Sequence, residues 1–174
     1  KPNEHVLMFL RRHWIVILKI VIMTLFMASF PALIYIGLQT ETNLLDNEAY
    51  KAFFTILISA FYLFVILFAF ANFVDYYLDV WIVTNERIIN IEQKGLFSRE
   101  ISEKELGQMQ DITSDVDGFL PTVLNYGNVY IQTAAEKERF VFKEIPFADE
   151  VARRISNLVS EYQKLNKTIE IDKM

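Results

Sequence analysis

Two histidines, His5 and His13, are the residues of this chain best suited to proton transfer or metal binding. Both lie near the N-terminus, ahead of two long apolar runs. A catalytic Ser–His pair or a histidine metal site needs its histidine inside a folded domain. The chain has no cysteine, which excludes disulfides, thiolate metal sites and thiol nucleophiles. We therefore expect neither histidine to have a catalytic or metal-binding role.

Acidic residues cluster in the second half of the chain. Asp111, Asp115 and Asp117 precede Gly118, a pattern that invites comparison with a calcium loop. The segment lacks the further oxygen ligands and the closing Glu of an EF-hand, so we interpret it as a solvated strand face. The same interpretation applies to Glu100, Glu103 and Glu105. No Gly-rich phosphate loop joins a strand to a helix, and we expect neither a cofactor nor enzymatic activity.

Charge and apolar content divide the chain near residue 75. Residues 75–174 hold twelve basic and eighteen acidic residues, whereas residues 1–74 hold five and four. The negative net charge of −5 therefore arises from the C-terminal part of the chain. An acidic surface of this kind does not predict binding to nucleic acid or to anionic lipid. The apolar fraction is 53%, with fifteen Phe residues, and the excess is concentrated before residue 83.

Two apolar runs, residues 14–38 and 52–74, are the strongest pattern in the sequence. About 20 apolar residues suffice for a helix to cross a bilayer. The connection between the runs is short, so residues 14–78 predict an antiparallel two-helix transmembrane hairpin. A cleaved signal peptide is the competing interpretation of the first run. The length of that run and the lack of a cleavage site after Leu38 disfavour it.

The first run carries two interruptions and a basic flank. Lys19 lies near the start of this run, where its long side chain can extend its ammonium group to the membrane surface. Alternatively, Lys19 contacts a polar partner inside a helix bundle. Pro31 predicts a kink. Arg11 and Arg12 precede this run, whereas Lys51 is the sole basic residue of the connection. The positive-inside rule then predicts that both termini and the C-terminal domain are cytoplasmic.

Basic and aromatic side chains flank both runs, as expected at a membrane–water interface. The predicted membrane-interface residues are Arg11, Arg12, Trp14, Lys19, Tyr76, Tyr77 and Trp81. The last three fit equally well as strand residues packed on a core. Residues 1–13 predict either a short interfacial helix or the fraying start of the first span. Because the chain starts at Lys1, we expect at least one residue to precede it in the native protein.

From residue 79 the apolar pattern alternates, with turn residues at Asn85–Glu86, Gln93–Gly95 and 136–138. This predicts about seven short strands in a meander. Pro146 is expected to open an amphipathic helix. The apolar positions of that helix are Phe147, Val151, Ile155, Leu158, Val159 and Tyr162. Such a helix is suited to cap the open end of a small barrel. Residues 166–174 are expected to form a tail, and the alternation of Ile169 and Ile171 there is compatible with a short added strand.

Three stretches resemble the bacterial pleckstrin-homology (PH)-like domain family: WIVTNERIINIEQKGLFSREISEKELGQMQDI, GFLPTVLNYGNVYIQTA, and a Phe–Val–Phe strand before the Pro-started helix. The resemblance covers residues 5–163 and is closest to the membrane-anchored branch, in which two transmembrane helices precede one PH-like domain. It implies an α+β membrane protein with an N-terminal transmembrane helical hairpin. A PH-like seven-stranded β-barrel or sandwich would follow over residues 79–165, capped by a C-terminal α-helix. It also implies the bacterial inner membrane as location.

The best-known PH domains bind phosphoinositides through Lys and Arg clustered at the first hairpin. The corresponding turn here holds Arg87 beside an acidic neighbour, with Lys94 and Arg99 as the nearest other basic residues. These three residues are the predicted ligand or partner surface. Their charge is too small for a polyphosphate pocket, so the resemblance transfers no head-group residues.

The resemblance implies a membrane-tethered interaction module, and some bacterial PH-like domains assemble into rings. We therefore expect a non-enzymatic protein whose partners are the bilayer and either another protein or its own copies. The alternative is a sensor or transport accessory that binds lipid or a small solute. In that case Lys19, Pro31 and Asn72 would line a polar feature between the spans.

Overall fold

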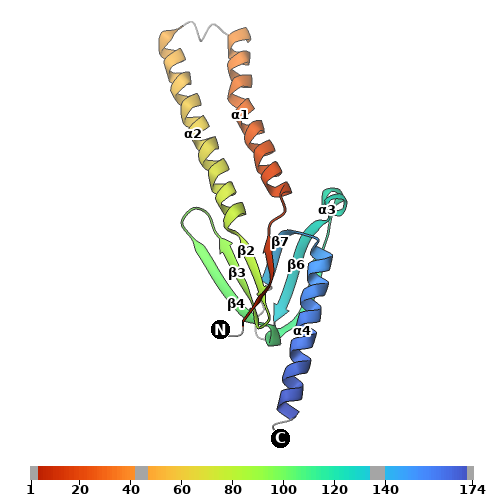
Figure 1. Cartoon of the computed structure of the whole chain (residues 1–174). Helices are drawn as coiled ribbons and strands as arrows, with labels where there is room; N and C mark the ends of the chain where they lie inside the picture. The colour runs from red at the N-terminus through yellow and green to blue at the C-terminus, as the bar shows by residue number, and fades with distance from the viewer. Residues whose placement is uncertain (1–3, 42–46, 134–139, 172–174) are drawn as a thin grey trace. The chain divides into compact units, whose positions relative to one another are not determined.

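The computed structural model describes residues 4–41, 47–133 and 140–171 of the 174-residue chain (Figure 1). The predicted turn at 136–138 lies outside these residues. The chain divides into two compact units, which we call the helical unit (Trp14–Tyr76) and the β-domain (Lys1–His13 with Tyr77–Met174). The helical unit contains α1 (Ile15–Glu41) and nearly all of α2 (Glu48–Leu78). The β-domain contains β1 (Val6–Arg11), β2 (Val80–Thr84), β3 (Arg87–Gln93), β4 (Arg99–Glu105), the 3₁₀ turn η2 (Leu106–Gln108), β5 (Met109–Asp115), α3 (Phe119–Leu124), β6 (Tyr126–Thr133), β7 (Phe140–Pro146) and α4 (Ala148–Ile171).

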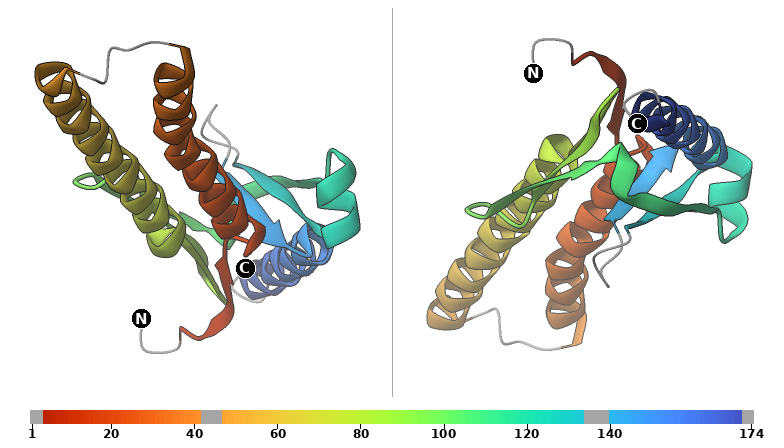
Figure 2. Two further views of the ribbon diagram at one scale, coloured as in Figure 1. Left: turned by 90° about the horizontal axis from the view of Figure 1, so that it is seen from above. Right: turned by 90° about the horizontal axis from the view of Figure 1, so that it is seen from below.

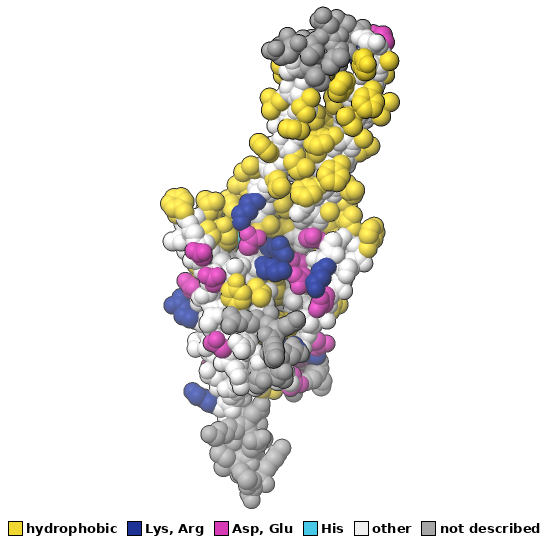
Figure 3. Space-filling view, turned by 180° about the vertical axis from the view of Figure 1, so that it is seen from behind, with side chains coloured by type: hydrophobic (Ala, Val, Ile, Leu, Met, Phe, Trp, Pro, Cys, Tyr) yellow, Lys and Arg dark blue, Asp and Glu magenta, His cyan; other side chains and the backbone are white. Residues whose placement is uncertain are grey.

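The two helices of the helical unit are long enough and apolar enough to cross a membrane. Both extend beyond the predicted runs 14–38 and 52–74. On the face shown in Figure 3, hydrophobic side chains cover most of the described surface of this unit. The helix α1 continues through Pro31. The Tyr62 hydroxyl of α2 donates a hydrogen bond of 3.1 Å to the Ala28 carbonyl of α1, close to that proline.

In the described part of the β-domain, seven antiparallel strands build two sheets. Sheet A has the order β1-β2-β3-β4 and sheet B the order β5-β6-β7, with η2 between them in the chain. The expected C-terminal helix is present, but residues 79–165 contribute six of the described strands rather than about seven, and β1 from the N-terminal segment is the seventh. The strands form two separate sheets rather than a closed barrel. Figure 2 shows both sheets with α4 running along sheet B.

Strand β1 is the main correction to the sequence prediction. Residues 1–13 were expected to form an interfacial helix or the start of a span, whereas Val6–Arg11 is a strand paired with β2. The physical reason is visible in its alternation, because Met8 and Leu10 pack against the core while Leu7 and Phe9 are exposed. The helical unit is thus an insertion in the connection between two hydrogen-bonded neighbours, β1 and β2.

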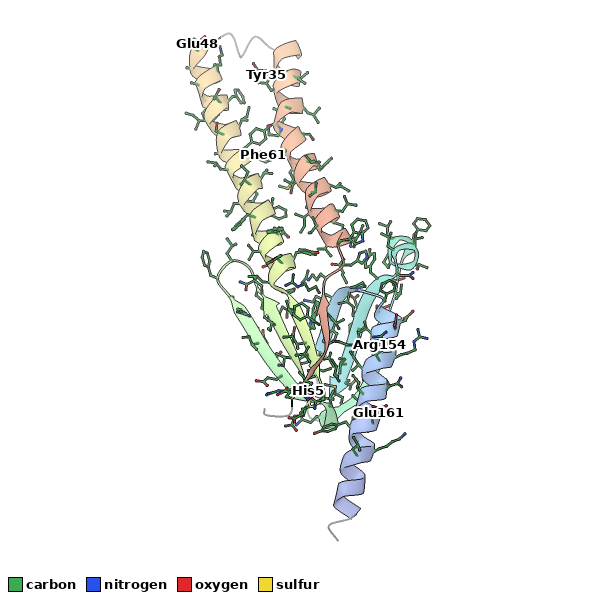
Figure 4. All side chains as sticks on the ribbon, in the orientation of Figure 1. His5, Tyr35, Glu48, Phe61, Arg154 and Glu161 are labelled. Atoms are coloured by element: carbon green, nitrogen blue, oxygen red, sulfur yellow. The ribbon has the colours of Figure 1, made fainter. Side chains whose placement is uncertain are left out.

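The core of the β-domain lies between the sheets and α4. Its buried residues are Trp81, Val83, Ile88, Leu106, Met109, Val129, Ile131, Phe142, Ile145, Ala148, Val151, Ala152, Ile155 and Val159. Along α4 the buried positions recur every three or four residues, which confirms the predicted stripe from Val151 onward. Its polar face carries pairs such as Arg154 with Glu150, and Figure 4 shows Arg154 and Glu161 on this helix.

The start and end of α4 differ from the prediction. Pro146 does not open the helix; it is the last residue of β7 and pairs with Tyr126. Phe147 follows with a left-handed φ of 52° and an exposed ring, so it does not belong to the buried stripe. The predicted tail from residue 166 is instead helical as far as Ile171, because the helical hydrogen bonds continue past the last packed turn.

Candidate functional site

The chain leaves the β-domain after β1 and re-enters it before β2. We call this end of the domain, marked by Arg12, His13 and Asp79, the junction end. Arg12 follows β1 and its guanidinium forms an ion pair with the Asp79 carboxylate, which lies just before β2. The other carboxylate oxygen of Asp79 accepts a hydrogen bond of 2.7 Å from the Gln93 backbone N–H at the end of β3. One carboxylate therefore links three strands.

Asp79 is a buried acid, with 0% of its side chain exposed, whereas 18% of the Arg12 side chain is exposed. Burial raises the pKa of the Asp79 carboxyl above its ordinary value, and the Gln93 amide and Arg12 oppose that rise. Both carboxylate oxygens of Asp79 are engaged, one by the Arg12 guanidinium and the other by the Gln93 N–H. The Arg12–Asp79 pair therefore joins the point where the chain leaves the β-domain to the point where it re-enters it.

His13 lies at the same end and is also buried. Its ring stacks on the Tyr126 ring with 5.0 Å between centroids, and its backbone N–H donates to the Glu144 carbonyl at 2.6 Å. Burial lowers the pKa of His13 below its ordinary value, with the Glu144 charge opposing. His13 thus packs its ring against sheet B just after β1 ends. In the described part of the chain, no group of three or more His or acidic residues could hold a metal ion.

The predicted membrane-interface residues separate into distinct environments. The Arg11 guanidinium lies over the rings of Phe9 and Tyr77, 5.2 Å from each centroid, and forms a cation–π cluster at the junction end. Trp14 is largely exposed. Trp81 corrects the prediction, because only 1% of it is exposed and its ring packs 5.4 Å from that of Phe142 in the core. As a β2 residue opposite Leu10, it faces inward.

Two other predicted interface residues lie within the spans. Lys19 is on the first turns of α1 with an exposed side chain, and Tyr76 is half-buried near the end of α2. The amide of Asn72 donates at 2.8 Å to the Phe68 carbonyl of its own helix. Pro31 belongs to an apolar pocket described below. The three residues proposed to line a polar feature, Lys19, Pro31 and Asn72, therefore do not line one pocket.

The structure does not bring the predicted partner residues Arg87, Lys94 and Arg99 into one basic patch. Arg87 and Arg99 lie at opposite ends of the β3–β4 ladder, where they pair with Glu105 and Gln93 respectively. Over the seven residues of β4 this separation is roughly 20 Å at about 3.4 Å per residue. Lys94 sits in the hairpin next to Arg99 and forms an ion pair with Glu100.

Arg87 is held by carboxylates on both sides. It donates to Glu4 through Nε at 2.8 Å and Nη2 at 2.6 Å, and to Glu103 through Nη1 at 2.5 Å. These bonds hold the pKa of Glu4 well below its usual range and raise that of Arg87. Sequence reasoning missed Glu4, because only the pairing of β1 with β2 brings it close to the β2–β3 turn.

The outer edge of sheet A is β4, which has no further strand beside it among the described elements. None of its seven residues is fully buried. Most are charged, and edge charges commonly protect a strand from unwanted pairing. Ile101, opposite Ile91 at the middle of the strand, is the exception, because it is apolar and exposed. The outer side of β4 therefore faces no further strand in the described part of the chain.

An apolar pocket of about 350 Å³ lies between the helices of the helical unit. Its lining residues are Phe30, Pro31, Ile34, Tyr35, Phe54, Leu57, Ile58 and Phe61. Tyr35 and Phe61, labelled in Figure 4, mark its two sides on α1 and α2. The lining is hydrocarbon and aromatic, so the pocket suits an apolar chain rather than a charged solute.

Comparison with known proteins gives two matches. The model of a family described as bacterial PH domain matches residues 15–159, a range that begins after β1. The crystal structure of a DUF1696 family protein with a pleckstrin-homology domain from Shewanella loihica PV-4 is similar at 15% identity, with a TM-score of 0.37. That similarity covers 49% of this chain and 70% of the other. No curated protein matches the sequence.

Proposed function

The chain belongs to the bacterial PH domain family, and on that premise we propose that it is a membrane-anchored, non-enzymatic interaction module. In this proposal α1 and α2 cross the bilayer, and the β-domain is presented at the membrane face. The domain binds a protein partner or a second copy of the chain. The observation that carries the proposal is the open edge of β4, with the exposed Ile101 at its centre.

Membrane anchoring is supported by the apolar surface of the helical unit. The candidate spans Ile15–Gly37 and Glu48–Leu78 have mean hydropathies of 2.2 and 2.6. Only 17% and 6% of their most apolar windows are buried. A core helix of a water-soluble protein buries such residues, so a hydrocarbon environment fits this surface better than water.

Orientation follows from the distribution of basic residues. Arg11, Arg12 and Lys19 lie at the N-terminal end of the first span, whereas Lys51, in the first turns of α2, is the one basic residue of the sequence that connects the two apolar runs. The positive-inside rule then places both termini and the β-domain in the cytoplasm of a bacterial cell, at the inner membrane.

The edge of β4 suits strand addition, in which main-chain hydrogen bonds supply affinity and alternate side chains supply specificity. A head-group pocket is less well supported, because Arg87 and Lys94 already pair with carboxylates of the domain. The proposed partner is therefore an extended protein segment, including β4 of a second copy.

The proposal is tested with the full chain in lipid nanodiscs. We expect a stable oligomer in light scattering, or a reproducible partner on capture from native membranes. The Ile101→Lys variant should lose this association, because it places a charge at the centre of the edge. Leu165→Lys changes an equally exposed apolar residue on α4 and should retain it. Neither oligomer nor partner, or equal behaviour of both variants, would reject the proposal.

The pocket between α1 and α2 favours a second candidate, binding of a lipid chain as a sensor or transport accessory. A Leu57→Trp variant would fill the pocket. If this function is correct, native mass spectrometry of the detergent-released chain should detect a retained lipid that L57W loses. An Ile66→Trp variant, on an exposed surface of α2 outside the pocket, serves as the matched control.

A further inference from the structure

The β3–β4 hairpin carries the most exposed large apolar side chain of the described residues. Phe97 lies in its tip with 99% of its surface exposed. The hairpin closes through a 2.8 Å hydrogen bond from the Lys94 N–H to the Ser98 carbonyl, and Gly95 takes the left-handed φ of 72° that the turn requires. An aromatic ring in water at a loop tip contributes nothing to the core and needs another explanation.

The hairpin tip lies at the junction end of the β-domain. The residue that begins the turn, Gln93, donates its backbone N–H to Asp79, the residue immediately before β2. Strand β3 therefore runs toward the point where the chain returns from α2, and the tip projects beyond it. Figure 1 shows β3 and β4 converging on this turn.

A second apolar projection, α3, lies at the same end. Phe119 is 81% exposed, and Leu120 and Val123 are also exposed. Phe119 and Val123 are four residues apart on one helix and share a face. The helix is followed by Tyr126, whose ring stacks on His13 where the chain leaves for α1.

Phe147 adds a further exposed ring beside α3. Its backbone N–H donates at 2.7 Å to the carbonyl of Asn125, the C-cap residue that follows α3. We call Phe97, Phe119, Leu120, Val123 and Phe147 the apolar rim. Phe97 lies in a hairpin of sheet A, whereas α3 and Phe147 adjoin strands of sheet B. Packing of a single sheet against the core therefore does not explain the exposed side chains of both.

We propose that the apolar rim inserts into the interfacial layer of the lipid bilayer. The proposal rests on the membrane anchoring proposed above, since the rim shares the end of the domain at which the chain passes to and from the two spans. Exposed Phe and Leu side chains partition into the boundary between head groups and acyl chains, at a depth of roughly 5–10 Å. The bilayer thus covers surface that water would otherwise solvate.

The charges beside the rim indicate insertion by apolar contact rather than recognition of anionic lipid. At the hairpin Lys94 is paired with Glu100, and Arg99 is one further exposed cation. At α3 the residue before Gly118 is the exposed Asp117, whose charge offsets that of Arg99 in the sum over the rim. The rim therefore has no excess of positive charge for an anionic head group. We expect insertion into membranes of zwitterionic lipid alone.

The absence of cysteine from the sequence allows a direct test. Single-cysteine variants F97C, L120C, L165C and L63C of the full chain carry a fluorescent label in phosphatidylcholine nanodiscs. Quenching is measured with lipids brominated near the top of the acyl chain and with a water-soluble quencher. Leu165 on α4 is the aqueous control, and Leu63, exposed on α2, is the membrane control. An unchanged thermal transition checks that each variant is folded.

We expect the lipid quencher to act several-fold more strongly at positions 97 and 120 than at position 165. If position 63 is quenched by lipid and positions 97 and 120 behave like 165, rim insertion is wrong while anchoring stands. If position 63 is not quenched, both proposals fail. Protection of positions 97 and 120 from both quenchers would also overturn rim insertion, since it indicates a protein contact at the rim.

Discussion

At the scale of single residues, Arg12 and Asp79 join the two ends of the inserted helical unit. Replacing Arg12 with Ala leaves the Asp79 carboxylate buried without its counter-charge. We expect the free energy of unfolding of the β-domain to fall by roughly 3 kcal/mol, as for other broken buried pairs. Chemical denaturation of the full chain in detergent, followed by the fluorescence of the buried Trp81, measures this loss.

Two companion variants separate burial from simple charge loss. Asp79→Asn keeps an oxygen that can accept a hydrogen bond from the Gln93 N–H, and the partly exposed Arg12 can still be solvated by water. The loss of stability should therefore be smaller than that of Arg12→Ala. Arg154→Ala breaks an exposed pair with Glu150 on α4 and should change stability by about 0.5 kcal/mol or less. Equal losses for Arg12→Ala and Arg154→Ala would contradict a structural role for the Arg12–Asp79 pair.

His13 predicts a dependence of stability on pH. Its folded pKa is lowered by burial, so the unfolded chain binds the proton more readily. Stability is therefore full above the ordinary pKa of 6.5 and declines as pH falls through it toward the lower folded value. The melting temperature of the full chain in detergent, measured from about pH 8 to about pH 5, should show this decline.

His13→Phe provides the control for that decline. Phenylalanine can still stack on Tyr126, but it has no proton to gain. The acid-induced fall in melting temperature should be smaller in this variant than in the wild type, while other carboxylates contribute equally to both. An identical pH profile for the two proteins would show that His13 does not contribute.

At the scale of elements, β1 has two faces with different roles. Leu10 packs against the core opposite Trp81, whereas Leu7 on the same strand is exposed. Leu10→Asp places a charge against the core at a half-buried position and should lower the free energy of unfolding by roughly 2 kcal/mol. Leu7→Asp should change it by about 0.5 kcal/mol or less. Denaturant titration of the two variants in detergent compares them directly, and similar losses would mean that β1 does not pack as described.

The difference between β1 and α4 explains what the sequence could predict. In α4 the apolar stripe is local, so Val151, Ile155 and Val159 identified its buried face from sequence alone. The alternation of β1 is equally local, but six residues beside a long apolar run are more readily interpreted as the start of a membrane helix. The partner strand is separated from β1 by the whole helical unit, and no local pattern identifies it.

The candidate site was predictable only in part for the same reason. Arg11 and Arg12 were identified by their position before the first apolar run, but the roles found for them depend on Tyr77 and Asp79, which lie at the end of α2 and just after it. Trp81 was ambiguous because a ring at the end of a span fits either a membrane interface or a core. Only the register of β2 against β1 decides between these environments.

At the scale of the whole molecule, the insertion predicts that the helical unit can be removed. Because Arg11 pairs with Val80, the chain ends left by deleting residues 13–78 are already neighbours; the deletion also removes His13, Tyr77 and Leu78, which belong to the β-domain. An Asn–Gly turn in their place, which suits a tight hairpin, should give a folded, water-soluble β-domain with both sheets intact. Circular dichroism and a cooperative thermal transition without detergent would check this.

A fragment of residues 79–174 is the matched control for the shortened chain. It has the same C-terminal domain but lacks β1, which leaves the inner edge of β2 unpaired and one side of the core uncovered. This fragment should aggregate or unfold where the turn-linked protein does not. A stable fragment 79–174 would show that β1 is dispensable to the domain.

The pairing of β1 with β2 also has a consequence for biogenesis. Arg12 and Asp79 are 67 residues apart, and the ribosome completes both long helices between them. During synthesis β1 therefore has no partner strand until α2 has been made and β2 follows it. In the membrane-anchored arrangement proposed above, a nascent chain in which only one of the two helices crosses the bilayer holds β1 and β2 on opposite faces of the membrane, so the strands cannot pair. Under that proposal, folding of the β-domain depends on correct insertion of its own anchor.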